Sequence, residues 1–203
     1  MSTSSQSAPA HDASISLAGA AVVLPTHPDA TLSLAGAELS RFLYRLTGTP
    51  SPRAEQCPGG NVAVVLSVSG SPAADTGGSA TMGEEGYRIA VKQVNDGRQV
   101  VVEATAAVGV LYGVYRLLEE LGMGFYAGGE TYPELPSQAR IPSGLDISER
   151  PAFAVRGNML HYNFLFGCTT WGLEDYKFYF DQLARTRCNM LLMHWYDDEP
   201  GAA

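Results

Sequence analysis

The sequence is poor in cysteine, in basic residues and in long apolar runs. It contains 3 cysteines and 13 Lys or Arg residues against 21 Asp or Glu residues, which gives a net charge of −8. This balance is unfavourable for contact with a phosphate backbone and argues against a nucleic-acid partner. No apolar run reaches the roughly 18 residues that a membrane-spanning helix needs, so no membrane partner is expected.

The cysteines do not form a recognisable framework. Cys57, Cys168 and Cys188 are odd in number and show neither CxxC nor metal-site spacing, so we expect reduced thiols rather than disulfides. The sequence also lacks a phosphate-binding glycine loop and a cluster of metal-ligand residues, and no cofactor is expected. The segment 1–14 has no Lys or Arg before an apolar stretch, which predicts no secretion signal and favours a cytoplasmic location.

The composition that is present suits a globular protein, since 45% of the 203 residues are hydrophobic. Residues 1–14 are rich in Ser and Ala without apolar periodicity, and we expect them to be disordered. Ala20–Leu24 predicts a first strand, and Asn61–Val68 predicts a strand covered on both faces. Between them, an apolar stripe that ends at Gly48 predicts a helix, and its members are Leu32, Ala35, Leu39, Phe42, Leu43 and Leu46.

The stretch from Glu85 to Tyr126 organises this first part of the chain. Apolar residues occupy every second position from Tyr87, and a run of β-branched residues follows the turn-forming Asn95-Asp96-Gly97. This order predicts a hairpin. From Val108 the apolar period changes to about 3.6, which predicts a helix that stops at Gly122. Two strands, this helix and a short strand at its end are typical of an α/β sandwich.

This stretch resembles the small α/β domain that precedes the catalytic barrel in several glycoside hydrolases, among them β-N-acetylhexosaminidases and α-glucuronidases. The residues that carry the resemblance are Glu85-Gly86-Tyr87-Arg88-Ile89, Val102-Glu103-Ala104, Gly109-Val110-Leu111-Tyr112-Gly113 and Leu117-Leu118-Glu119. The resemblance implies an accessory domain over residues 15–126 and a carbohydrate substrate for the protein that contains it. None of these residues is expected to perform chemistry.

Residues 127–149 hold three prolines and show no periodicity, which predicts a linker and a domain boundary near Arg150. Beyond it, Phe153–Leu160 predicts a strand, Leu173–Arg187 a helix, and Asn189–Trp195 a second buried strand. The expected apolar stripe of this helix is Leu173, Tyr176, Tyr179, Phe180 and Leu183. Strand, helix and strand make one βαβ unit, the repeating piece of a (β/α)8 barrel.

A complete barrel takes about 250 residues, so the segment 150–203 holds only its start. The expected fold is therefore α/β: a small α/β sandwich with a mixed sheet and two helices on one face, followed by the first βαβ unit of an incomplete barrel. Such a unit leaves open strand edges, and we expect it to pack against the remainder of its own barrel.

Acidic residues follow the second strand of this unit. Glycosidases use two carboxyl groups, and barrel enzymes place catalytic groups at the carboxyl ends of strands. Asp197 and Glu199 occupy such a position, which makes them weak candidates for catalysis beside the alternatives of a substrate rim or a solvated loop. In the resembled families the catalytic carboxylates lie further along the barrel, so the acid and base of this protein are not assigned.

Arg156 is a candidate for sugar binding by resemblance. Arg156-Gly157-Asn158-Met159-Leu160 resembles the Arg-Gly-x-x-Leu of the first barrel strand in β-N-acetylhexosaminidases, whose arginine binds hydroxyls of the terminal sugar. A guanidinium can fork onto two hydroxyls or a sugar carboxylate. The hexosaminidase pattern continues with Asp where this chain has His161, which leaves a uronic-acid or other glycoside equally open. A structural ion pair is the alternative role for this arginine.

Other candidates for substrate contact lie near the predicted strand ends. His161 and His194 are placed to contact sugar or carry protons, although a lone histidine is more often structural. Trp171 lies in a loop where its ring is able to stack on a pyranose face. We therefore expect the N-terminal part of a glycoside hydrolase, inactive by itself. The alternative is a stand-alone carbohydrate-binding or interaction module.

Overall fold

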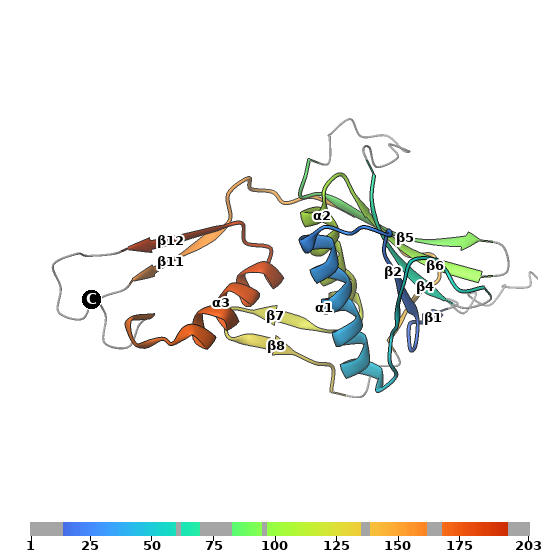
Figure 1. The fold of residues 1–203 in the computed structure, drawn as a ribbon, viewed down its shortest axis with the longest axis horizontal. Coiled ribbons are helices and arrows are strands. Elements are labelled where there is room, and N and C mark those ends of the chain that lie inside the picture. Colours follow the sequence, from blue (N-terminus) through green and yellow to red (C-terminus); the bar gives the residue numbers. More distant parts are fainter. Residues whose placement is uncertain are drawn as a thin grey trace, which may run out of the picture.

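The computed structural model describes residues 14–59, 62–69, 83–94, 97–134, 139–161 and 168–194 (Figure 1). The elements are β1 (Ser14–Ser16), β2 (Ala21–Val23), α1 (Ala30–Thr47), β3 (Arg53–Ala54), β4 (Ala63–Val68), β5 (Tyr87–Val94), β6 (Gly97–Ala104), α2 (Ala107–Glu120), β7 (Gly124–Tyr126), β8 (Gly129–Thr131), β9 (Arg140–Pro142), β10 (Asp146–Glu149), β11 (Gly157–His161), η1 (Cys168–Thr170), α3 (Leu173–Arg185) and β12 (Met190–His194). Apart from Ser14, the expected disordered segment 1–14 lies outside the described residues.

A six-stranded mixed sheet forms the centre of residues 14–149, which we call the sheet body. Its strand order is β10-β5-β6-β4-β2-β3. β3, β2, β4 and β6 run parallel to one another, whereas β5 is antiparallel to both β6 and β10. The predicted hairpin is confirmed by the register of β5 and β6, which pairs Val94 with Gly97. Its turn, residues 95–96, lies outside the described residues.

Helix α1 forms where the sequence predicts it. The Asp29 carboxylate accepts a hydrogen bond of 2.7 Å from the Leu32 backbone N–H, which satisfies one of the free donors of the first turn. Gly48 ends the helix with a φ of 70°, a conformation that favours glycine. The predicted apolar stripe is buried along its whole length, from Leu32 to Leu46.

Helix α2 is buried around most of its circumference because other elements surround it. α1 and α2 stand side by side between the sheet and a layer made of α3 with the β7–β8 hairpin (Figure 1). Gly109 and Gly113 bring the helix backbone close to the sheet: a Cβ atom at Gly113 would lie 2.6 Å from Val102 Cγ1. No described helix is both long and apolar enough to cross a membrane.

The expected linker is wrong, because residues 127–149 contain β8, β9 and β10. β10 extends the main sheet, pairing Ile147 with Ile89, and β9 pairs with β1. These strands have three or four residues each, too few to establish an alternating pattern in the sequence. The predicted strand at Gly124–Tyr126 exists, but it pairs with β8 rather than joining the sandwich sheet.

The expectation that the strand predicted at Asn61–Val68 is covered on both faces is also corrected. In β4, Val64 and Leu66 are buried under the helices, whereas Val65 and Ser67 on the other face are only half-buried. The helices lie on one side of the sheet, and the outer face is partly open.

The last part of the chain contains a βαβ unit, as predicted: β11 and β12 are parallel, and α3 connects them. We call residues 157–194 the βαβ unit. The predicted apolar stripe of α3 is only partly buried: Tyr179 is buried, whereas Leu173 is 70% exposed and Phe180 is 45% exposed. The predicted burial of the second strand is also wrong, because Leu192 is exposed. The buried face of α3 shares Tyr179 with the predicted stripe and adds the polar residues Gln182 and Arg185.

We predict that Gly109→Ala destabilises the protein by about 1–3 kcal/mol, the usual cost of overpacking. The added Cβ would meet the Gly86 carbonyl oxygen at 2.5 Å and the Glu84 carbonyl oxygen at 2.8 Å, and backbone atoms move away less easily than side chains. Gly144→Ala is the matched control, because nothing lies within 4 Å of its Cβ. Urea unfolding measures both. Equal stability of the two variants would contradict the close packing of α2 on the sheet.

Candidate functional site

The carboxyl ends of β11 and β12 are the expected place for the site residues. The parallel register pairs His161 with His194 at these ends, so two of the candidates lie on adjacent strands. The segments that follow them, 162–167 and 195–203, lie outside the described residues, and with them Asp197 and Glu199. In the described part of the chain, no group of three or more His, Cys, Asp or Glu residues is placed to hold a metal ion.

Trp171 lies between η1 and α3, in the connection that follows β11. Its ring centroid is 5.4 Å from that of Tyr176 and 5.2 Å from that of Tyr179. The Tyr176 hydroxyl donates a 2.9 Å hydrogen bond to the Cys168 carbonyl oxygen, which fixes the turn. Burial raises the pKa of Tyr179, and the polar side chain of Asn158 on β11 has the opposite, smaller effect. Trp171 is thus held on the side of the unit where β11 ends, as part of an aromatic cluster.

Arg156 lies at the other end of β11, before Gly157. Five residues of strand at about 3.3 Å each separate it from His161, roughly 16 Å. Its guanidinium donates to the Arg187 carbonyl oxygen at 2.8 Å and to the Phe153 carbonyl oxygen at 2.6 Å. It also forms a 2.9 Å ion pair with Glu85 of the sheet body. In this structure the side chain joins the two parts of the chain, and its binding to sugar stays a prediction.

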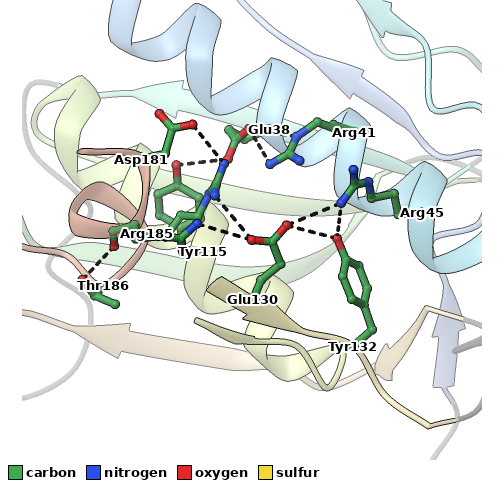
Figure 2. Close-up of polar contacts among 10 residues, drawn as sticks. Glu38, Arg41, Arg45, Tyr115, Glu130, Tyr132, Asp181, Arg185 and Thr186 are labelled. Carbon is green, nitrogen blue, oxygen red and sulfur yellow. Dashed lines mark hydrogen bonds and ion pairs between the residues drawn. The ribbon is translucent and has the colours of Figure 1, made fainter. Parts of the chain in front are cut away.

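A buried polar cluster lies where α3 meets the sheet body (Figure 2). The Arg185 guanidinium is 3.1 Å from Glu38 of α1 and 3.5 Å from Glu130 of β8, and it also reaches Asp181 at 3.4 Å. Burial lowers the pKa of Arg185, but the nearby carboxylates, Glu38 first among them, outweigh it and raise the pKa overall. Arg185 therefore links three elements that are distant in the sequence.

Further groups complete the hydrogen bonding around these carboxylates. Arg41 pairs with Glu38 at 2.8 Å, and Arg45 pairs with Glu130 at 3.4 Å. The Tyr115 hydroxyl is within 3.4 Å of Glu38, and burial followed by the charge of Glu38 raises its pKa. The side-chain amide of Gln182 bridges two neighbours: its nitrogen donates a hydrogen bond to the Tyr126 carbonyl oxygen, and its oxygen accepts one from Arg185.

This arrangement suits a structural joint rather than catalysis, because arginines neutralise both carboxylates. Sequence reasoning missed it, because nothing local in the sequence indicates that Arg185 and Arg187 pair with carboxylates of the sheet body. One signal was present in the sequence. Tyr179, Gln182 and Arg185 recur every three residues, which places them on one helical face.

The comparisons with known proteins fit this architecture. The family described as glycosyl hydrolase family 67 N-terminus matches residues 6–117, more than half of the chain. The chain belongs to this family. The resemblance to the N-terminal domain of a glycoside hydrolase is therefore confirmed. A search of curated proteins finds no match.

Solved structures show the same fold over most of the chain. A mutant β-hexosaminidase from Streptomyces plicatus, in complex with the product GlcNAc, is 26% identical, with a TM-score of 0.58 over 91% of this chain. A family GH115 4-O-methyl-α-glucuronidase with specificity for decorated arabinogalactans is 13% identical, with a TM-score of 0.63 over 91% of this chain. The matched part of this chain covers only 32% of the length of the hexosaminidase and 26% of the length of the glucuronidase.

We predict that Arg185→Met destabilises the βαβ unit by about 3 kcal/mol, because it leaves buried carboxylates without their cation. Arg45→Met is the control. It removes a partner of the same Glu130, but the Arg45 side chain is 52% exposed against 7% for Arg185, so its loss should cost under about 1 kcal/mol.

Tryptophan fluorescence during urea unfolding measures this effect, because both tryptophans lie in the last part of the chain, at positions 171 and 195. Circular dichroism reports on the helices of the whole chain in parallel. If the Arg185→Met and Arg45→Met variants unfolded at the same urea concentration, the polar cluster would contribute little to the stability of the βαβ unit.

Proposed function

We propose that this chain is the N-terminal accessory part of a glycoside hydrolase and that β11, α3 and β12 are the first βαβ unit of its catalytic barrel. The observation that carries the proposal is a parallel strand pair with a helix on one face and exposed apolar side chains on the other.

The face of the strand pair opposite α3 has the character of a barrel interior. α3 lies on the face of Asn158, which meets Tyr179. Alternation and register place Met159, Met190 and Leu192 together on the other face, where Met159 is 43% exposed and Leu192 is 51% exposed. Barrel helices lie outside, and layers of apolar side chains fill the interior. Covering this face with further strands would bury all three side chains.

The proposed substrate is a glycoside whose terminal sugar is an N-acetylhexosamine or a uronic acid. The family match and the sugars named for the similar structures support this choice. His161, His194 and Trp171 lie at the end of the unit where barrel enzymes bind their substrates, and they are the proposed sugar contacts. Arg156 lies at the other end of β11, paired with Glu85, and is a separate proposed contact rather than a member of this group.

Hydrolysis of a glycoside requires two carboxyl groups on either side of the scissile bond. Glu38 and Glu130, the most buried carboxylates of the polar cluster, are held by arginines and serve structure. We therefore propose that the catalytic carboxylates come from further barrel strands, and that Asp197 and Glu199 are rim residues at most.

We predict that residues 1–203 alone hydrolyse neither aryl N-acetyl-β-glucosaminides nor aryl α-glucuronides above the buffer rate. The measurement is release of the aryl group, with the same substrates tested for binding by titration calorimetry. Turnover that disappears in Asp197→Asn or Glu199→Gln would contradict the proposal, because it would place a working acid in this chain. Tight sugar binding without turnover would instead indicate a carbohydrate-binding module.

A further inference from the structure

The ion pairs between the sheet body and the last part of the chain share one polarity. Arg185 pairs with Glu38 and Glu130, Arg187 pairs with Glu119 at 2.6 Å, and Arg156 pairs with Glu85. In these four pairs the arginine comes from residues 150–194 and the glutamate from the sheet body. The four glutamates, from α1, β8, α2 and the turn before β5, form what we call the acidic docking surface.

Few apolar groups are available to orient the βαβ unit on this surface. Two of the three side chains that α3 buries, Gln182 and Arg185, are polar. Asn189 adds a further polar link, donating to Glu85 at 2.9 Å. Polar interfaces between parts of one chain commonly allow relative motion, and charge complementarity determines their orientation more than their strength.

Arg187 shows that this pairing has a structural cost. Its φ is 61°, in the left-handed region that is unfavourable for side chains other than glycine. The residue directly follows the C-cap of α3, a position where glycine is usual. The chain holds a strained arginine here, and the guanidinium of that arginine reaches Glu119 of α2. The contact offers a physical reason for arginine in place of glycine.

We propose that the acidic docking surface and the three arginines form a charge-dependent joint. When the pairs are broken or screened, the βαβ unit undocks as one piece while the six-stranded sheet stays folded. The sheet body thus acts as a template that holds the first strands of the next domain in a defined orientation. This inference goes beyond the proposed function, since it concerns contacts within the chain and requires no sugar.

Hydrogen exchange of the full chain tests the joint. Arg187→Gly removes the charge and relieves the backbone strain, so a folding defect at the helix end cannot account for its effect. Loss of a partly exposed ion pair predicts that amides of residues 173–194 exchange about fivefold faster. Amides of β5 and β6 should keep their rates. Arg88→Gln is the matched control, because Arg88 pairs with Asp146 at 2.8 Å within the sheet body.

A charge swap and a salt series complete the test. Glu119→Arg alone should accelerate exchange in residues 173–194, and the double variant Glu119→Arg with Arg187→Glu should restore it to within about twofold. In the unaltered chain, 1 M NaCl should accelerate exchange there relative to β5 and β6, because salt screens partly exposed charges. The proposal fails if Arg187→Gly behaves like Arg88→Gln, if the swap does not restore protection, or if salt affects both regions equally.

Discussion

The buried guanidinium of Arg185 is the constraint on which the arrangement of this chain depends. It joins α3 to Glu38 of α1 and to Glu130 of β8, elements separated by up to 147 positions in the sequence. A charge in this position is stable only while its partners remain, so the three elements must take one mutual orientation. This contact orients α3 against the helix layer and the β7–β8 hairpin (Figure 2).

Close packing holds the helix layer against the sheet beneath the polar cluster. Gly109 and Gly113 let α2 approach β5 and β6, and that approach places Tyr115 beside Glu38. The two histidines at the carboxyl ends of β11 and β12 thus lie on a unit whose placement is determined on its opposite side, where Arg156 meets Glu85. In a chain that belongs to a family of glycosyl hydrolase N-terminal domains, this arrangement is the basis for the proposal that the sheet body positions the next domain.

The sequence predicted best the elements that are long and periodic. α1, α2 and the β5–β6 hairpin carry their caps, glycines and alternation locally, so each was recognisable without the rest of the fold. β8, β9 and β10 were missed because their pairing partners are distant and their own residues are few. For α3 the apolar stripe was right only in part, because Tyr179 is buried but other members are not. Leu173 and Phe180 are exposed here, and the polar residues that make the contact carry no hydrophobic signal.

For the candidate site, topology alone brought His161 and His194 together, whereas the role of Arg185 depends on three-dimensional contacts that no local pattern encodes. The most direct test is a double-mutant cycle with Glu38→Gln, Arg185→Met and the double variant, measured by urea unfolding. A buried, hydrogen-bonded pair predicts a coupling free energy of about 2 kcal/mol or more. A coupling below about 0.5 kcal/mol, the usual limit of additivity, would contradict the central place given to this contact.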